Sequence, residues 1–416
     1  MAEINNKPAL RFAGFTEAWE QRKLSELATM HARIGWQNLR TSEFLDSGDY
    51  MLITGTDFED GAINYSTCHY VEKMRYDQDT HIQIDNGSIL ITKDGTLGKV
   101  AYVQGLSMPA TLNAGVFNVE IKDEKEVDRK YLFQYLKAPF LMDYVDKKAT
   151  GGTIKHLNQN ILVDFPVVLP NIEEQTSIGA YFSSLDNLIT LHQRKYDNLK
   201  NVKKACLEKM FPKNGSNVPE IRFKGFTEAW EQRKLGEVVG ITSGFMGDSL
   251  LSDGKYHLTR IETIADGIVD ENRIGYSNKK PDDMYLLNHG DILYSNINSI
   301  SHMGKVAKYQ GNSTLYHGIN LLRLQPENNI NSDFLLYLLN TEKCRNWAKT
   351  RANQAVSQAS INQSLLATQE IAISSFDEQE KIGKYFVNLD NLITLHQRKL
   401  EKLKNLKKAC LEKMFI

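Results

Sequence analysis

The chain lacks the short motifs with which many enzymes bind nucleotides or metals or form acyl intermediates. No GxxxxGKS/T, GxGxxG, HExxH or GxSxG sequence occurs. Only two residues separate Gly95 from Gly98 ahead of Lys99, too few for a phosphate-binding loop. There is also no Pro-Pro dipeptide, and hence no Asp/Asn-Pro-Pro-aromatic motif of amino methyltransferases. We therefore predict that this chain has no catalytic site of its own.

Cysteine is scarce, and long hydrophobic runs are missing. The four cysteines, Cys68, Cys206, Cys344 and Cys410, fall in no CxxC or CxxH pairing, which argues against a zinc site or a disulfide framework and fits a reducing compartment. No run of about 18 apolar residues occurs, and residues 1–12 lack the apolar region of a signal peptide. We expect a cytoplasmic protein with no metal site and no contact with a membrane.

Neither sign of charge dominates the composition. The chain has 50 Lys and Arg against 51 Asp and Glu, a formal net charge of -1, so binding to nucleic acid would require a locally positive surface. With 41% hydrophobic and 24% charged residues, the composition is that of a soluble globular protein. A length of 416 residues suggests two or three domains.

Two blocks of sequence are present twice. Ile178–Phe211 returns as Ile382–Phe415 at an offset of 204 residues, and Phe15–Leu24 returns identically as Phe226–Leu235 at an offset of 211. The chain is therefore a tandem duplication in which each copy has a fixed beginning and a fixed end. Two domains are favoured, because the sequence between the fixed blocks of each copy is long enough for one domain.

The two variable regions predict mixed α/β domains. In both 25–156 and 236–360, short strand-like runs separated by Gly, Asn and Asp precede a helical segment. The connections 92–97 and 295–303 occupy corresponding places between two strands but differ in length and chemistry. Loops that vary on a fixed scaffold commonly carry recognition.

The long repeated block predicts a coiled-coil helix. No Gly or Pro interrupts it after Gly179 or Gly383, and Leu, His and Cys recur at three and four spacing. We predict that the two helices pair antiparallel and that the chain termini meet, giving a circular, approximately two-fold organisation. His192 and His396 on the seam are interpreted as packing or register residues, because no second metal ligand is spaced to join either.

Basic residues gather toward the end of each long helix. The segment from Leu191 to Lys213 contains seven Lys or Arg and two acidic residues, and the segment from Leu395 to Ile416 contains the same numbers of each. These flanks are either solvated faces of a coil, or surfaces that follow DNA phosphates or meet an acidic partner. The aromatic residues Phe12, Phe15 and Trp19 of the segment Pro8–Leu24, which includes the first fixed block, are interpreted as packing anchors.

A polar segment in each copy ends just before the point from which the two copies align without insertions. Residues 150–156 and 354–360 are rich in amides, hydroxyls and cations, the groups that pair with base edges. A flexible polar loop is the alternative interpretation. Their shared position just ahead of the repeated LNQNIL and INQSLL elements favours a role in recognition.

The sequence resembles the specificity subunit of a type I restriction-modification system, a class of phage-defence complex. The resemblance lies in PNIEEQTSIGAYFSSLDNLI (170–189), SFDEQEKIGKYFVNLDNLI (375–393), the FTEAWEQRKL pair and TGGTIKHLNQ (150–159), and it covers essentially the whole chain. Two departures are Ser374-Ser375, where the first copy has Leu169-Pro170, and Ala-Val-Ser in place of the second TGG.

The resemblance implies a sequence-specific, non-catalytic DNA-binding subunit. Each variable block would be a target recognition domain that reads one half of a bipartite double-stranded DNA site, with the helices setting the spacer. It also implies two modification subunits that bind S-adenosylmethionine and methylate adenine, and two restriction subunits that use ATP and magnesium, so that no cofactor belongs to this chain. The alternative is a non-DNA scaffold with two ligand-binding domains on a coiled-coil hub.

We therefore predict an α+β fold: two pseudo-symmetric mixed α/β target recognition domains separated by two long helices that form an antiparallel coiled coil. The predicted segments are 1–156 (repeat segment and recognition domain 1), 157–218 (central fixed region with a long helix), 219–360 (repeat segment and recognition domain 2) and 361–416 (C-terminal fixed region with a long helix). The predicted DNA-binding residues are Lys93, Lys99, Thr150, Gly151, Gly152, Thr153, Lys155, His156, Asn296, Lys305, Arg351, Asn353, Gln354, Ser357 and Gln358.

Overall fold

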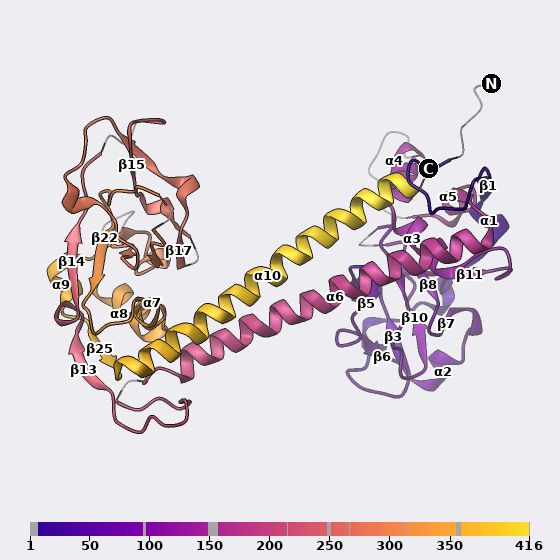
Figure 1. Ribbon diagram of the computed structural model, residues 1–416. Coiled ribbons are helices and arrows are strands. Elements are labelled where there is room, and N and C mark those ends of the chain that lie inside the picture. The colour runs from indigo at the N-terminus through magenta and orange to yellow at the C-terminus, as the bar shows by residue number, and fades with distance from the viewer. Residues whose placement is uncertain are drawn as a thin grey trace. The chain divides into compact units, whose positions relative to one another are not determined.

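Contacts divide the chain into two compact units. The computed structural model describes residues 7–94, 97–148, 157–213, 215–247, 251–265, 267–311, 313–354 and 359–415, with the backbone alone for Trp36, Ala265 and Gln354. Unit 1 is Met1–Leu191 with Lys399–Ile416, and unit 2 is His192–Arg398 (Figure 1). Each unit thus combines one variable domain with parts of both long helices.

Unit 1 is built from short strands followed by helices. Its strands are β1 (Glu20–Lys23), β2 (Ala28–His31), β3 (Met51–Ile53), β4 (Phe58–Glu59), β5 (Ala62–Ile63), β6 (His69–Tyr70), β7 (Gln83–Ile84), β8 (Ile89–Thr92), β9 (Val100–Tyr102), β10 (Ala110–Leu112), β11 (Val116–Ile121) and β12 (Pro166–Leu169). Its α-helices are α1 (Leu24–Leu27), α2 (Lys73–Tyr76), α3 (Arg129–Lys137), α4 (Phe140–Lys148), α5 (Gln159–Val163) and the first part of α6 (Ile172–Lys209).

Two four-stranded sheets form the variable domain of unit 1. One has the order β2-β11-β8-β9 and is antiparallel throughout, and the other has the order β6-β3-β10-β7 with a parallel β3–β10 pair. Strand β8 is buried along its whole length, as its β-branched and aliphatic sequence ILIT favours. The fixed block contributes β1, which pairs antiparallel with β12.

Unit 2 repeats this plan with a different sheet. Its strands are β13 (Glu231–Lys234), β14 (Val239–Ser243), β15 (Tyr256–Leu258), β16 (Ile264–Ala265), β17 (Gly267–Val269), β18 (Gly275–Ser277), β19 (Ile292–Tyr294), β20 (Ile297–Asn298), β21 (Val306–Lys308), β22 (Leu322–Pro326), β23 (Asn353–Gln354), β24 (Ala359–Ser360) and β25 (Glu370–Ile373). Its α-helices are the second part of α6, α7 (Ser332–Leu339), α8 (Glu342–Arg351), α9 (Gln363–Ala367) and most of α10 (Phe376–Met414).

A six-stranded sheet of order β14-β22-β19-β21-β17-β16 forms the centre of unit 2. Glycines at corresponding places in the two copies take equivalent conformations, since Gly87 and Gly290 have φ of 101° and 94° ahead of β8 and β19. Gly98 and Gly304, ahead of β9 and β21, have φ of 71° and 74°. This left-handed region favours glycine, so the faint correspondence between the variable regions reflects shared turns.

The long helices pair antiparallel within each unit. In unit 1 Phe415, just past the end of α10, stacks on Phe182 near the start of α6, with ring centroids 5.6 Å apart. In unit 2 Phe211 stacks on Phe386 at 5.9 Å in the equivalent way. The predicted antiparallel coiled-coil pairing is confirmed. Among the helices that the described ranges contain, none is long and apolar enough to cross a membrane.

The N-terminal segment packs on the end of the C-terminal helix, as the circular organisation predicts. The N–H of Leu10 donates to the carbonyl of Lys413 at 2.8 Å, and the N–H of Ile221 donates to the carbonyl of Lys209 at 2.9 Å. Each contact joins the segment just ahead of an FTEAWEQRKL block to the end of a long helix. In unit 1 this contact joins the N-terminal and C-terminal parts of the chain. In unit 2 the equivalent contact joins two segments that follow each other directly in the sequence.

A buried ion pair anchors the segment just ahead of each FTEAWEQRKL block. The guanidinium of Arg11 donates twice to the carboxylate of Glu174, both at 2.7 Å, and Arg222 pairs with Glu378 at 2.7 and 2.8 Å. Both carboxylates are fully buried, and such bidentate pairs have strict geometry. The hydrogen bond to Glu174 raises the pKa of Arg11. Trp19 and Trp230, each 2% exposed, pack in the two cores, confirming a packing role for this aromatic position.

A fixed glycine lets each long helix approach its domain. A Cβ atom built on Gly179 would lie 2.9 Å from the backbone nitrogen of Tyr131, and one on Gly383 would lie 3.0 Å from that of Phe334. The side-chain carbonyls of Gln175 and Gln379 accept from backbone N–H groups at the starts of α3 and α7. The repeated sequence thus encodes the same docking of domain on helix twice.

Candidate nucleic-acid interface

Lys93 follows β8 at a point where three segments of unit 1 meet. Its N–H donates to the carbonyl of Gly115 at 2.8 Å, and its own carbonyl accepts from the N–H of Leu157 at 2.8 Å. The half-buried side chain holds its ammonium 5.3 Å from the centroid of the Phe117 ring, a cation–π contact. Lys93 therefore joins the β8–β9 connection to the element that follows the predicted recognition loop.

Six predicted residues of unit 1 lie outside the described residues, in the segment 149–156. They are Thr150, Gly151, Gly152, Thr153, Lys155 and His156. Helix α4 ends at Lys148 before this segment, and the buried Leu157 follows it. Lys99 is exposed, and its N–H donates to the hydroxyl of Thr92 at 2.9 Å.

Asn296 occupies the place in unit 2 that Lys93 occupies in unit 1. Its carbonyl accepts from the N–H of Ile361 at 2.8 Å, and its side-chain amide donates back to the carbonyl of Ile361 at 3.0 Å. With 8% of its surface exposed, Asn296 is buried and links the β19–β21 connection to Ile361 by these two hydrogen bonds. Its geometry favours positioning of neighbouring groups, while contact of Asn296 with a base stays a prediction.

The polar segment predicted in unit 2 forms a small sheet with the β19–β21 connection. Strand β24 pairs antiparallel with both β20 and β23, so that Asn353 and Ile297 both face Ser360. Asn353 is exposed, Gln354 is described by its backbone alone, and Ser357 and Gln358 fall outside the described residues. The structure therefore brings together the two regions singled out in this copy.

Arg351 and Lys305 lie on either side of this small sheet in the sequence. Arg351 is exposed at the last position of α8. Lys305 is half-buried just before β21, and its carbonyl accepts from the N–H of Ser295 at 2.8 Å. Of the residues predicted in unit 2, Arg351 and Asn353 thus present exposed polar side chains.

A groove of about 810 Å³ runs beside Arg351. One face of α8 lines it with Lys343, Asn346, Trp347 and Thr350, and residues 215–217, Gln232 and 368–370 complete it. Sequence reasoning missed these α8 residues. Their i, i+3, i+4 and i+7 spacing puts them on one helix face, a signal that was present in the sequence.

A buried ion pair stiffens the strands of this domain. Arg323 on β22 contacts Asp291, ahead of β19, at 2.6 Å, and both side chains are almost fully buried. Burial raises the pKa of Asp291 despite its hydrogen bonds to Asn288 and Arg323. Such a pair suits a structural role, because its charges already satisfy one another.

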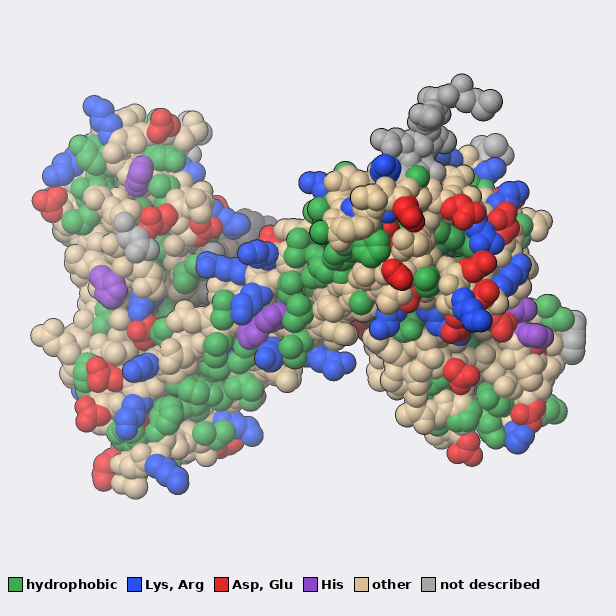
Figure 2. All heavy atoms as spheres, turned by 45° about the vertical axis from the view of Figure 1, so that its right-hand side comes forward, with side chains coloured by type: hydrophobic (Ala, Val, Ile, Leu, Met, Phe, Trp, Pro, Cys, Tyr) green, Lys and Arg blue, Asp and Glu red, His purple; other side chains and the backbone are tan. Residues whose placement is uncertain are grey.

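The basic flanks of the long helices divide into two groups. Lys203 and Lys407 form interhelical salt bridges with Asp390 and Asp186, at 2.5 and 2.6 Å. The other Lys and Arg of these flanks are exposed, and Figure 2 shows blue side chains along the helices. The exposed members are Arg194, Lys195, Lys200, Lys204, Lys209 and Lys213 on the first flank and Arg398, Lys399, Lys402, Lys404, Lys408 and Lys413 on the second.

His192 and His396, which are equivalent positions of the two copies, contact each other. Their Nδ1 atoms are 2.7 Å apart and their ring centroids 4.9 Å apart. Each residue therefore contacts its own counterpart in the repeated block, which fixes how the two helices are aligned at this point. The pair therefore marks the register of the coiled coil, as the sequence interpretation of these residues expected.

A duplicated chain with two mixed domains, each carrying its own candidate recognition segments on a shared antiparallel helix pair, defines a two-site recognition subunit. The family model described as type I restriction modification DNA specificity domain matches twice, at residues 16–201 and 227–405. The chain belongs to this family and is a type I restriction-modification specificity subunit. The resemblance seen in the sequence is confirmed, and the hub alternative is not favoured.

Relatives support the same assignment. A Methanocaldococcus jannaschii protein provisionally named type I restriction enzyme MjaX specificity subunit is 41% identical over 205 residues, 48% of each chain, so this match spans about half of either protein. The MjaVIII specificity subunit of the same organism is 24% identical over 94% of each chain. The crystal structure of a type I restriction-modification S subunit from M. genitalium is similar in fold, with a TM-score of 0.65, 17% identity and coverage of 99% of both chains.

Proposed function

We propose that this chain reads a bipartite double-stranded DNA target, with one half-site for each variable domain. One observation carries the proposal: in both units the β8–β9 or β19–β21 connection is bonded to the residue that follows the polar segment, through Lys93 to Leu157 and Asn296 to Ile361. The framework of this junction is common to the two units, and its polar side chains differ. A common framework with different side chains is what two different half-sites require.

The exposed residues of unit 2 supply chemistry for both kinds of DNA contact. Arg351 and Asn353 offer donors and an acceptor that pair with base edges. Lys343, in the groove beside them, is suited to a phosphate. In unit 1 Lys93 and Lys99 flank the connection that precedes β9. Phosphate contacts would set the register of the domain, and base contacts would give sequence preference.

The repeated surface of the long helices supports the proposed partners. Unit 1 exposes Leu188, Leu191 and Leu406, each by 43 to 46%, and unit 2 exposes the equivalent Leu392, Leu395 and Val202, by 43 to 45%. Exposed apolar side chains repeated in this way suit a protein partner. Because each unit has the same set, we propose two modification subunits, one on each set, and two restriction subunits in the full complex.

The cofactors of the reaction would belong to those partners. S-adenosylmethionine would be bound by the modification subunits, and ATP and magnesium by the restriction subunits, because this sequence has no motif for any of them. This chain would select the site and hold the enzymes there. Incubating the chain alone with labelled S-adenosylmethionine and target DNA is the direct check, and methyl transfer by the lone chain would contradict this division of labour.

An exchange of recognition domains tests the proposal. Residues 25–156 are replaced by the corresponding block of a related subunit, and modified adenines are located by methylation-sensitive sequencing in cells that carry the partner subunits. The expected result is a change in one half of the methylated motif, with the other half and the spacer retained. The matched control exchanges residues 236–360 and should change the opposite half. A change in both halves from one exchange would refute modular recognition.

A further inference from the structure

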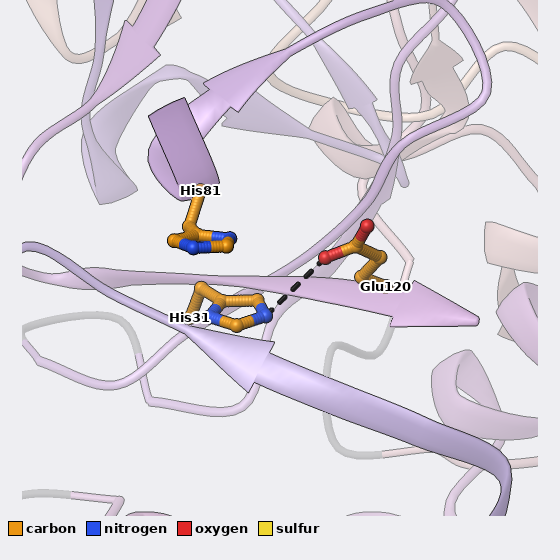
Figure 3. A group of neighbouring side chains, drawn as sticks. All are labelled: His31, His81 and Glu120. Carbon is orange, nitrogen blue, oxygen red and sulfur yellow. Dashed lines mark ion pairs between the residues drawn. The ribbon is translucent and has the colours of Figure 1, made fainter. Parts of the chain in front are cut away.

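Three side chains with metal-binding chemistry meet on the variable domain of unit 1. They are His31 at the end of β2, His81 in a 3₁₀ turn (Thr80–Ile82) and Glu120 on β11. Figure 3 shows the two imidazoles stacked face to face with the carboxylate beside them. The ring centroids are 4.6 Å apart with an interplanar angle of 15°, and Nε2 of His31 lies 3.3 Å from a carboxylate oxygen of Glu120.

The backbone on which these side chains stand is held in place. His31 pairs with Asn118 across the β2–β11 ladder. The side-chain amide of Asn118 donates to the carbonyl of His81 at 3.2 Å, and Asp79 accepts from the N–H of His81 at 2.9 Å. A single buried amide, Asn118, thus ties the turn that carries His81 to the strand pair that carries His31 and Glu120.

The donor set and its spacing suit a zinc-class ion. Two imidazole nitrogens and one carboxylate oxygen form a known type of zinc ligand set, with ligands about 2.0–2.2 Å from the metal. Tetrahedral ligand atoms at that distance lie about 3.4 Å apart, close to the separation of His31 and Glu120. All three ligand atoms are within 4.8 Å of one another, and the exposed ring of His81 can turn to close the remaining gap.

We propose that His31, His81 and Glu120 bind one divalent transition-metal ion of the zinc class, with water in a fourth position. The ion would fasten the 79–82 turn to β2, the edge strand of its sheet. Its consequence would be a more stable recognition domain, because a ligand that binds the folded state alone shifts the folding equilibrium. The site lies on the strands and not among the residues proposed to contact DNA.

The second copy of the domain lacks these ligands. Ladder β14–β22 corresponds to β2–β11, and Thr242 and Gln325 occupy the positions of His31 and Glu120. Among the residues that the structure describes, His31, His81 and Glu120 are also the one group of three candidate ligands within such a distance. The proposal therefore demands one ion per chain and not two.

The competing interpretation is a stacked histidine pair in which His31, when protonated, forms an ion pair with Glu120. The two interpretations differ in their response to Zn²⁺. A metal site takes up one ion through all three side chains, whereas a stacked pair beside a carboxylate takes up none.

The test uses the full chain, stripped with a chelator and free of any polyhistidine tag. Uptake of Zn²⁺ is measured by equilibrium dialysis at micromolar concentrations, and Co²⁺ is used as a spectroscopic probe of the ligand environment. The variants are His81→Ala, His31→Gln and Glu120→Gln. His257→Ala, at an exposed histidine of unit 2, is the matched control, and circular dichroism verifies that each variant is folded.

The native chain and the control should bind one equivalent of Zn²⁺, and affinity should fall as the pH is lowered. Each ligand variant should bind about 100-fold more weakly, since even changes outside the ligand shell cost about 10–100-fold. Failure of the native chain to take up one equivalent would overturn the proposal. So would uptake that survives in the folded His81→Ala variant, since binding would then lie elsewhere.

Discussion

The two units make the same contacts with their fixed blocks and different contacts with their variable regions. Arg11–Glu174 and Arg222–Glu378 have nearly equal geometry, whereas unit 1 contains two four-stranded sheets and unit 2 one six-stranded sheet. The lesson is that the fixed blocks define how a domain sits on the helices, and the domain's interior strands are free to change. Recognition can then diverge without altering the attachment.

The prediction with the largest expected effect asks whether the Arg11–Glu174 and Arg222–Glu378 attachments are independent of each other. Glu174→Ala leaves Arg11 without its buried partner and removes the acceptor of Trp19, whose indole N–H lies 3.2 Å away. Breaking a buried pair costs about 3–5 kcal/mol. Hydrogen exchange followed by mass spectrometry should show lost protection in residues 10–24.

The matched variant is Glu378→Ala, which should expose residues 221–235 and spare 10–24. Equal loss of protection in both segments from either variant would show that the two attachments are coupled, and the comparison between units would fail on that point.

A second prediction separates the units by pH. Burial lowers the pKa of His317, in unit 2, to about 4, although its Nε2 hydrogen bond to the carbonyl of Leu321 opposes the shift. The unfolded state takes up the proton near pH 6.5, so this stabilisation is complete above that pH and is lost as the pH falls from about 6.5 to about 4. The full difference is about 3 kcal/mol.

The measurement is the urea unfolding of unit 2 at several pH values between 7 and 4.5, with hydrogen exchange as the readout. The described histidines of unit 1 are all at least partly exposed, so that unit should change less. In His317→Gln the pH dependence of unit 2 should largely disappear. A wild-type slope retained in this variant would show that another group is responsible.

The sequence predicted the parts of the fold that repetition makes visible. The antiparallel helices, the meeting of the termini and the packing of Trp19 all follow from identical blocks at constant offsets. The variable sheets were predicted only as short strands, because pairing partners such as β3 and β10 lie far apart in the chain. Pairing over such separations depends on tertiary packing, which a local pattern does not contain.

The DNA-contacting residues of the candidate site stay predictions. Around the two polar segments the structure describes Leu157, whose N–H donates to the carbonyl of Lys93, and Ala359–Ser360, which pair with β20. The burial of Asn296 could not be foreseen, since it depends on Ile361, which is distant in sequence. The cluster of His31, His81 and Glu120 was missed for the same reason, and the sequence prediction of no metal site is at variance with the ion proposed for it.

A third prediction compares recognition by the two units. Arg351→Ala removes an exposed guanidinium from unit 2 and should weaken specific DNA binding of the complete complex by about 1–3 kcal/mol if it pairs with a base. Fluorescence anisotropy with targets altered in either half-site should show relaxed preference in one half alone. A uniform loss with all sequences, together with a smaller salt dependence, would assign Arg351 to a phosphate instead.

The smallest expected effect concerns the two equivalent salt bridges between the long helices. The side chain of Lys407 is 10% exposed and that of Lys203 is 26% exposed. Both partners accept a further hydrogen bond, Asp186 from Gln134 and Asp390 from Tyr337. Electrostatic attraction is stronger where water is excluded, and exposed pairs contribute about 0–1 kcal/mol. Lys407→Met should therefore lower the stability of unit 1 by about 1–2 kcal/mol and Lys203→Met that of unit 2 by less. Local hydrogen-exchange rates in the two units, measured at low and high salt, provide the check.

Salt should diminish the effect of Lys203→Met more than that of Lys407→Met, because the buried pair is less screened. The reverse order would mean that burial does not set the strength of these pairs.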